Sequence, residues 1–356
     1  SPDVIHAVDT LFENPNQKLI SSKATQKQID IKQKEIQKEN EDQINRVLNH
    51  AIQKSGPVHL NVPMEEPLYG MTTSLIKITL NTEPEFYHPN VDFKTFKKQW
   101  KNAEKKLILV GVNDPNVIDQ QWLDLIDADP SVILMTETTS NLRSSNAVNS
   151  IDSLIAPLEM GSHVFFKTLK PQILLTFGGM VVSKKIKKLL RYHSPQEHWH
   201  VDPFRAYDTY YCLTKHFSMT VNSFFTELLN DYQAPMTNYK SSVLNQYQSQ
   251  LQKGNAYLRQ IPFSDLKAFE TIFSNLPDQI HLQLANSSPV RYAQLFDMPK
   301  GAEVFSNRGT SGIDGSTATA VGAALINQNP SLLITGDLSF FYDINGLWNN
   351  HIPSNF

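Results

Sequence analysis

Residues 107–139 read LILVGVNDPNVIDQQWLDLIDADPSVILMTETT, and this stretch decides the fold class. Two short apolar runs, 107–110 and 132–135, enclose a segment with helical spacing of apolar residues that stops at Asp129-Pro130. Apolar runs without polar alternation are typical of parallel strands that are covered on both faces. The stretch therefore predicts a strand–helix–strand unit of an α/β protein with a doubly wound parallel sheet.

The same alternation of strands and helices continues along the chain. Further strands are predicted at 173–176, 199–201, 280–284 and 332–335, and helices at 183–191, 266–276, 316–327 and 344–349. In such folds the ligands bind at the carboxyl ends of the parallel strands. We therefore expect the functional residues in the segments that directly follow the strands.

The N-terminal part contains a smaller αβ unit. Apolar residues at helical spacing predict a helix over 44–52, Gly56-Pro57 ends it, and 58–62 alternate like a strand. One helix and one strand are too few to bury a core. We therefore expect this segment to be the last piece of a domain that begins upstream, and the region after 332–335 to be cut at its C-terminus.

Length and composition exclude several classes of protein. The chain has 356 residues, 40% of them hydrophobic and 19% charged, which suits two or three globular domains. Its net charge of −3 argues against a general nucleic-acid binder, and no apolar run approaches the ~18 residues of a membrane span. The single cysteine, Cys212, leaves no disulfide within one chain, so a reducing cytoplasm is expected. Residues 1–40 show no pattern that predicts a role.

The tetrapeptide Gly336-Asp337-Leu338-Ser339 follows the predicted strand at 332–335. A carboxylate at this edge of a parallel sheet is placed to hold Mg²⁺, which takes oxygen ligands and bridges protein to phosphate. Gly336 allows the backbone to approach a phosphate, and the Ser339 hydroxyl can donate a hydrogen bond to it. The alternative is an ordinary turn after a strand.

A second polar segment, SNRGTSGIDG at 306–315, precedes the predicted helix at 316–327. A loop of this composition before a helix offers N–H groups to an anion, and Arg308 adds a planar guanidinium suited to carboxylate or phosphate. Ile313 is unusual there, because an apolar side chain in a polar loop has nothing obvious to pack on. The alternative is a tight connection that leaves Arg308 on the surface.

A third polar segment, ANSSPVR at 285–291, follows the predicted strand at 280–284. It either caps a short helix through Ser287 or Ser288, or it holds a ligand. Both interpretations stay open on the residues alone, since one serine can do both.

Four blocks of sequence together resemble one enzyme family. They are GPVHLNVPMEEPL at 56–68, ANSSPVR at 285–291, SNRGTSGIDG at 306–315 and GDLSFFYDINGL at 336–347. In this order they resemble the 2-succinyl-5-enolpyruvyl-6-hydroxy-3-cyclohexene-1-carboxylate synthases, thiamine-diphosphate enzymes of menaquinone biosynthesis. The combination of SNRGxSGIDG with GDLS is specific, whereas GPVHLNVP alone indicates only the wider thiamine-diphosphate superfamily.

The resemblance implies three αβ domains. Residues 1–66 correspond to the C-terminal remnant of a pyrimidine-binding domain, 67–232 to a central domain, and 233–356 to the N-terminal part of a diphosphate-binding domain. Members of this family are transferases that decarboxylate 2-oxoglutarate on thiamine diphosphate, with Mg²⁺, and add the succinyl-semialdehyde carbanion to isochorismate. Their active sites lie between two subunits, which implies a homodimer or homotetramer.

The resemblance also assigns roles to residues within the matching blocks. Asp337 matches the Mg²⁺ ligand, and Ile313 matches the hydrophobic wedge under the cofactor. The expected cofactor contacts are Ser311, Gly312, Ile313, Gly336, Asp337, Leu338 and Ser339. The expected contacts to the carboxylates of the substrates or to the intermediate are Asn286, Ser287, Arg291 and Arg308.

Lys184 and Lys185 match a Lys-Arg pair that reaches the second substrate in the family. Because the second position is Lys here, a bidentate contact becomes a point charge. The alternative is a solvated helix face, since Lys187 and Lys188 continue the basic run.

Two parts of the family's site have no match in this sequence. The glutamate that activates the cofactor belongs to the missing front of the first domain, and Glu65 and Glu66 do not replace it. The second Mg²⁺ ligand is an asparagine on a strand beyond Phe356. We therefore expect this polypeptide alone to be inactive.

Two other functions compete with this interpretation. One is another thiamine-diphosphate carboligase or decarboxylase, of the acetohydroxyacid-synthase type; those enzymes usually carry Gly-Asp-Gly where this chain has Gly336-Asp337-Leu338. The other is a non-catalytic nucleotide-binding α/β module, which the lack of a G-x-G-x-x-G segment after any predicted strand disfavours.

Overall fold

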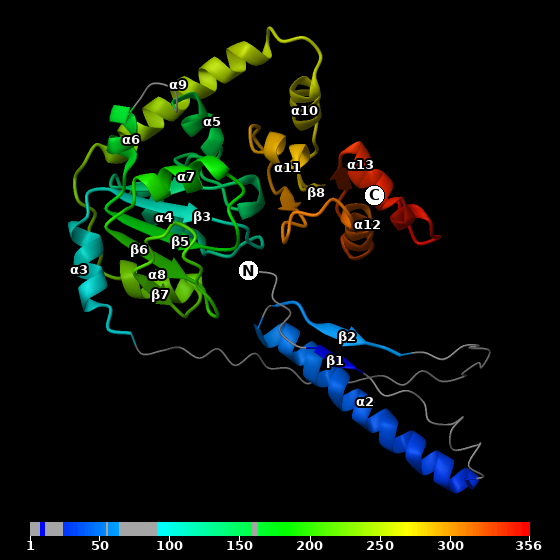
Figure 1. The fold of residues 1–356 in the computed structure, drawn as a ribbon. Coiled ribbons are helices and arrows are strands. Elements are labelled where there is room, and N and C mark those ends of the chain that lie inside the picture. Colours follow the sequence, from blue (N-terminus) through cyan, green and yellow to red (C-terminus); the bar gives the residue numbers. More distant parts are fainter. Residues whose placement is uncertain (1–7, 11–23, 55, 64–90, 159–162) are drawn as a thin grey trace. The chain divides into compact units, whose positions relative to one another are not determined.

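The structure is a computed structural model that describes residues 8–10, 24–54, 56–63, 91–158 and 163–356 (Figure 1). The chain divides into two compact units, Ser1–Phe86 and Tyr87–Phe356, and each is described by itself. Within the described ranges, no helix is both long and apolar enough to cross a membrane.

The first unit consists of one long helix and a pair of short strands. The helix α2 (Gln26–Lys54) contains the predicted helix at 44–52 and also residues 26–38, which are rich in Lys and Gln, so the two form one continuous element. The strands β1 (Val8–Thr10) and β2 (His59–Asn61) pair in parallel. The strand β2 was predicted from its alternation, whereas β1 is an element that the sequence pattern did not indicate.

The second unit is built on a five-stranded parallel sheet in the order β4-β3-β5-β6-β7. Its strands are β3 (Lys106–Val110), β4 (Val132–Met135), β5 (Ile173–Phe177), β6 (Glu197–Val201) and β7 (Lys215–Phe217). Along β3, Leu107 and Leu109 belong to one core cluster and Ile108 and Val110 to another. Because neighbouring strand residues point to opposite faces, both faces of the sheet are covered. The predicted doubly wound parallel α/β fold is confirmed.

Helices cover the two faces of this central sheet. On the face of Ile108 the core includes residues from α3 (Lys94–Asn102), α4 (Gln120–Ala128) and α8 (Val221–Leu229). On the face of Leu107 it includes residues from α5 (Ile151–Ile155), α6 (His163–Leu169), α7 (Lys184–Tyr192) and α9 (Tyr239–Leu258). Two 3₁₀ turns, η1 (Thr138–Ser140) and η2 (Ala156–Leu158), complete the connections. The helix α9, which lies after the predicted boundary at 232, thus packs on the central sheet.

A second, three-stranded parallel sheet has the order β10-β8-β9. Its elements are α10 (Asp265–Phe273), β8 (His281–Leu284), α11 (Ser288–Ala293), β9 (Glu303–Phe305), α12 (Ser316–Ile326) and β10 (Ser331–Ile334). After it follow α13 (Asp337–Tyr342) and the 3₁₀ turn η3 (Ile344–Leu347), where a single helix at 344–349 was predicted. The polar segments at 285–291, 306–315 and 336–339 thus each follow one strand of this sheet.

The side chain of Asn141 links the two sheets. Its Nδ2 donates to the carbonyl oxygen of Val304 in β9 at 3.0 Å, and its Oδ1 accepts from the Val304 amide at 2.7 Å. The same Nδ2 also donates to the carbonyl oxygen of Asn113 at 2.8 Å. An amide group therefore occupies the place of a neighbouring strand's backbone and fixes β9 beside the carboxyl edge of the central sheet.

Candidate functional site

The structure brings the two most informative polar segments into contact. The Ser339 hydroxyl in the first turn of α13 donates to the carbonyl oxygen of Ile313 at 2.6 Å. Ser339 is buried, Asp337 and Leu338 are exposed, and Ile313 is half-buried. The carboxyl end of β10 and the loop at 306–315 therefore form one local surface, which carries the carboxylate of Asp337.

The side chain of Asn286 holds the loop at 306–315 in place through hydrogen bonds. Its Nδ2 donates to the carbonyl oxygens of Asn307, at 2.6 Å, and Gly312, at 2.7 Å, while its Oδ1 accepts from the Arg308 guanidinium at 2.5 Å. Asn286 is 3% exposed, so these partners satisfy a buried amide completely on both sides. Asn286 thus positions Arg308 and the turn around Gly312.

Three backbone positions in this region lie at positive φ. Ser287 has φ 73° and ψ −123°, Ser311 has φ 62°, and Gly315 has φ 74°. A serine with the dihedral angles of Ser287 is strained, because that region is populated almost only by glycine, and such strain clusters at functional sites. Ser287 stands at the N-cap position of α11 but its side chain makes no capping hydrogen bond. The capping alternative for Ser287 is therefore not realised.

Cationic side chains from separate elements converge near this loop. Burial and the neighbouring charge of Arg291 lower the pKa of Arg308, and the carboxylate of Glu137 opposes that effect. The Nε of Arg308 is buried and has no hydrogen-bond partner. Burial also lowers the pKa of Lys187. The charge of Arg308 lowers this pKa further, and the charge of Glu137 raises it. Within the described residues, Arg291, Arg308 and Lys187 form no ion pair.

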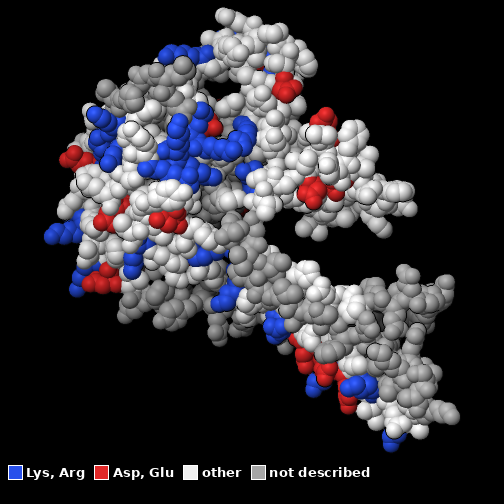
Figure 2. All heavy atoms as spheres, in the orientation of Figure 1, with Lys and Arg blue, Asp and Glu red and all other residues white. Residues whose placement is uncertain are grey.

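The lysines belong to the first turns of α7, over which Lys and Arg side chains gather (Figure 2). Ser183 caps the helix by accepting from the amide of Ile186 at 3.2 Å. Lys184 is exposed and Lys185 is half-buried. Cations at a helix N-terminus are disfavoured by the helix dipole, so this arrangement has a local cost that anion binding would offset. Lys187, which the sequence left as a surface residue, is the lysine that the structure links electrostatically to Arg308.

Glu137 lies two residues after the end of β4, and no sequence motif assigns it a role. It is 1% exposed, and its carboxylate accepts from the amides of Val182, at 2.5 Å, and Ser183, at 2.7 Å. Burial raises the pKa of Glu137 to about 7, although these two hydrogen bonds favour the charged form. The signal available in the sequence was an acidic residue directly after an apolar strand.

The first turn of α12 provides the test of whether a diphosphate fits. The hydroxyl oxygens of Ser316 and Thr317 are buried without a hydrogen-bond partner, and Gly315 leads into the helix at positive φ. Unpaired hydroxyls at a helix N-terminus suit a phosphate. The neighbouring amide of Ala318 already donates to Oδ2 of Asp343 at 2.7 Å. A diphosphate bound at this end of the helix would therefore lie beside the Asp343 carboxylate or displace it.

A cation at Asp337 would depend on ligands from outside this surface. Among the described residues, no group of three or more His, Cys, Asp or Glu side chains is arranged to hold a metal ion. Mg²⁺ often takes one or two carboxylates and completes its octahedron with phosphate and water. One exposed carboxylate beside an anion-binding loop fits that pattern. The side chains present would not hold the ion without phosphate and water.

Comparison with known proteins gives a consistent set of relatives. The chain is 47% identical over 327 residues to the 2-succinyl-5-enolpyruvyl-6-hydroxy-3-cyclohexene-1-carboxylate synthase of Flavobacterium psychrophilum, an alignment that covers 90% of this chain and 58% of that protein. The proteins of the same name from Flavobacterium johnsoniae and Christiangramia forsetii are 46% and 44% identical, over 89% and 91% of this chain and 58% and 57% of their own lengths. The chain therefore spans less than two thirds of these relatives. No protein-family model matches it.

Proposed function

The chain is homologous to the 2-succinyl-5-enolpyruvyl-6-hydroxy-3-cyclohexene-1-carboxylate synthases over about nine tenths of its length, and from this premise we propose that it serves the same reaction. That reaction decarboxylates 2-oxoglutarate with thiamine diphosphate and Mg²⁺ and joins the remaining four-carbon unit to isochorismate, a step of menaquinone biosynthesis. The proposal concerns the full-length protein, acting in the cytoplasm as a homodimer or homotetramer.

One observation supports the proposal above all others: the hydrogen bond from Ser339 to the carbonyl oxygen of Ile313. The motif GDLS and the loop SNRGTSGIDG are separated along the chain by a helix and a strand. A thiamine-diphosphate site needs both of them at one place, because one carries the metal-binding carboxylate and the other faces the cofactor. A structure with the two segments apart would have left only an α/β scaffold of unassigned purpose.

The cofactor-facing residues are proposed to act as follows. Asp337 would hold Mg²⁺, and the unpaired hydroxyls of Ser316 and Thr317 would face the diphosphate. Ile313 is half-buried near the C-terminal end of the loop, and its apolar side chain would support the cofactor. When bound, thiamine diphosphate supplies the electron sink that decarboxylation of a 2-oxo acid requires.

The cationic residues are proposed to select the substrates. 2-Oxoglutarate and isochorismate each carry two carboxylates, and guanidinium groups bind carboxylates through paired hydrogen bonds. Arg308 is held in place by Asn286 and keeps a buried, unpartnered Nε, so it is pre-organised for an anion. Arg291 and Lys187 add positive charge from α11 and α7, and Lys184 and Lys185 extend it toward solvent.

Substrate preference in the full-length protein tests this function. With thiamine diphosphate and Mg²⁺ present, CO₂ release from 2-oxoglutarate is expected to exceed release from pyruvate by at least about a hundredfold, because pyruvate lacks the second carboxylate. R308Q is expected to raise the KM for 2-oxoglutarate by about tenfold or more, whereas K253Q, which removes an exposed lysine of α9, leaves it unchanged. Equal use of pyruvate would favour the acetohydroxyacid-synthase type instead.

A further inference from the structure

A cavity of about 280 Å³ lies between the carboxyl end of β4 and the segment that follows α11. Its walls include Thr136, Thr138, Arg143 and Asn149 on one side and Phe296 and Met298 on the other. None of the residues proposed above for substrate, cofactor or metal lines it. The function discussed so far therefore leaves this cavity without an occupant.

Arg143 is the residue that gives the cavity its chemistry. One of its terminal guanidinium nitrogens is buried and has no hydrogen-bond partner. Burial lowers the pKa of Arg143 to about 10, and the charge of Asp297 acts against that shift without forming an ion pair. Asp297 itself is exposed. A partly buried guanidinium without an anion costs free energy that a bound carboxylate would recover.

Three other polar groups of the wall already have hydrogen-bond partners. The Thr136 hydroxyl donates to Oδ1 of Asn149 at 3.0 Å, and Nδ2 of Asn149 donates to the carbonyl oxygen of Ser144 at 2.9 Å. The Glu137 carboxylate accepts from the amides of Val182 and Ser183. Among the residues that line the cavity, Arg143 alone carries a buried polar atom without a partner. The cavity thus presents one strong hydrogen-bond donor.

The opposite wall combines the apolar side chains of Phe296 and Met298 with the exposed carboxylate of Asp297. Phe296 and Met298 are partly buried and pack against the core of the three-stranded sheet. A pocket with an apolar wall and one convergent cation suits a small molecule with an apolar body and a single anionic head. A phosphate ion would use the cation but would leave the apolar wall without a partner.

We propose that this cavity is a binding site for a small monocarboxylate with an apolar body, whose carboxylate pairs with Arg143 and whose body lies on Phe296 and Met298. One wall belongs to the connection that contains Asn141, and the other lies shortly before β9, to which Asn141 is hydrogen-bonded at Val304. Such a ligand would therefore add a second link across the same junction between the two sheets.

Benzoate is the probe, and benzamide, which has the same ring without the charge, is its control. In calorimetry on the full-length protein, benzoate is expected to bind and benzamide is not. R143Q is expected to weaken benzoate binding by about tenfold or more, the value of one charged hydrogen bond. R143K keeps the charge but not the planar fork, so intermediate affinity is expected.

Two further variants separate this site from the proposed substrate site. S145W fills the cavity from an exposed lining position and leaves Arg143 in place, so it is expected to abolish benzoate binding even if R143Q fails to fold. R308Q removes the arginine of the substrate site and is expected to leave benzoate affinity unchanged. Unchanged binding in S145W, or loss of binding in R308Q alone, would overturn the proposal.

Discussion

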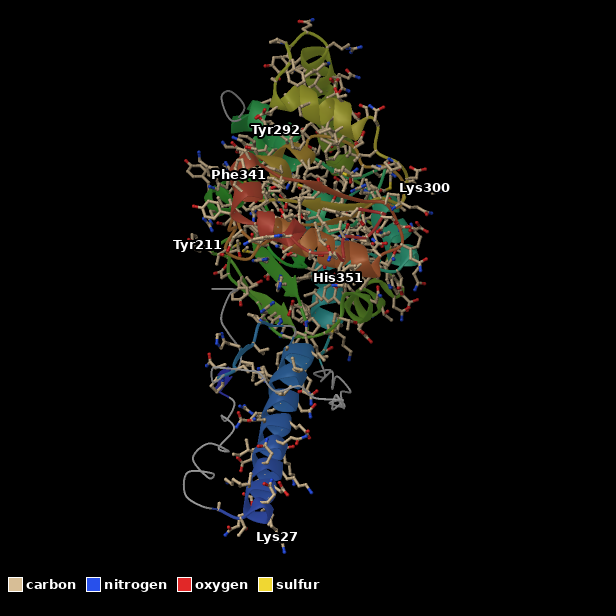
Figure 3. All side chains as sticks on the ribbon, turned by 90° about the vertical axis from the view of Figure 1, so that its right-hand side faces the viewer. Lys27, Tyr211, Tyr292, Lys300, Phe341 and His351 are labelled. Carbon is tan, nitrogen blue, oxygen red and sulfur yellow. The ribbon has the colours of Figure 1, made fainter. Side chains whose placement is uncertain are left out.

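The two sheets of the second unit differ in how thoroughly they are buried. Every residue of β3, β4 and β5 in the central sheet is buried, whereas every residue of β10 in the three-stranded sheet is only half-buried. The elements after β10 expose large apolar side chains: Phe341 is 67% and Trp348 is 87% exposed, and Figure 3 labels Phe341 on this part. The predicted site thus lies on the less buried sheet. The central sheet is the frame, meaning the buried scaffold that supports it.

Stability and binding chemistry are thus divided between the two sheets. The central sheet holds stacked rings such as Trp100 and Trp199, with centroids 6.0 Å apart, in a closed core. At the proposed site, the backbone strain of Ser287 and the unpaired polar atoms of Arg308 and Thr317 belong to the three-stranded sheet and its loops, although the central sheet also has unpaired groups, such as the Thr139 hydroxyl. Substitutions in the frame are therefore expected to change global stability, and substitutions near the site to change local opening and binding.

The largest effect is expected at the buried ion pair of the central sheet. Lys106 and Asp129 lie 3.2 Å apart with 0% and 3% of their side chains exposed, and the Tyr232 hydroxyl donates to the same carboxylate oxygen at 2.6 Å. D129N leaves a buried ammonium group without its counter-charge, so the free energy of unfolding is expected to fall by about 3–5 kcal/mol. Denaturation followed by the fluorescence of Trp100 and Trp199 reports this transition.

The double variant K106M/D129N is the control for that experiment. Removal of both charges is expected to restore most of the stability, since an apolar replacement of a buried ion pair is often neutral. If D129N altered only hydrogen exchange in β8 and β10, the division of stability between the two sheets would be wrong.

The next effect is a pH dependence of the central sheet. Burial lowers the pKa of His198 to about 4, with a smaller contribution from His200. Because the folded pKa lies below that of the unfolded chain, near 6.5, the neutral ring stabilises the fold fully above pH 6.5. That contribution, up to about 3 kcal/mol, is expected to be lost as the pH falls from 6.5 to 4.

Tryptophan fluorescence during denaturation at several pH values measures this dependence. The Thr176 hydroxyl lies 2.9 Å from Nε2 of His198, so H198Q keeps a polar partner there without a titrating group. The variant is expected to flatten the profile between pH 4 and 6.5. An equally steep profile in H198Q would assign the acid sensitivity to other groups.

A smaller effect is expected where the two sheets meet. N141A removes the side chain that both donates to and accepts from the backbone of Val304, which leaves two groups of β9 without partners. Local opening of β9 is expected to become easier by about 1–3 kcal/mol. Hydrogen exchange with mass-spectrometric readout is expected to rise in β9, while the tryptophan transition stays in place.

The matched control is N146A, at an exposed asparagine of the same connection. It is expected to leave exchange in β9 unchanged. If N141A also destabilised the unfolding transition seen by tryptophan fluorescence, the two sheets would unfold as one unit rather than separately.

How much of this organisation the sequence predicts depends on the distance between the partners. The strands β3, β4, β5 and β10 follow from their apolar runs, and the meeting of 306–315 with 336–339 follows from the rule that parallel strands end at one edge. The family's residue roles follow from short motifs. The site-residue assignments themselves stay predictions.

The remaining features depend on contacts that no local pattern encodes. The amides that Glu137 binds, those of Val182 and Ser183, are more than forty positions away in the chain. The pairing of Asn141 with Val304 joins two sheets, and the charge of Lys187 becomes relevant only because α7 faces Arg308. The segment after β10 also begins its helix at Asp337, earlier than the predicted 344, with Gly336 as the N-cap residue.

The smallest effect is expected from relief of strain at Ser287. Glycine adopts φ 73° and ψ −123° readily, so S287G removes a conformational cost of about 1–3 kcal/mol, which the entropy lost by glycine on folding partly offsets. A net stabilisation of the three-stranded sheet by less than about 1 kcal/mol is expected, seen as slower hydrogen exchange in α11.

S288G, at an exposed position with ordinary helical geometry, is the matched control and is expected to destabilise α11 by about 0.5–1 kcal/mol. If the strain serves substrate binding, S287G also raises the KM for 2-oxoglutarate while S288G does not. Destabilisation by both variants alike would mean that the serine side chain, rather than its backbone conformation, matters at position 287.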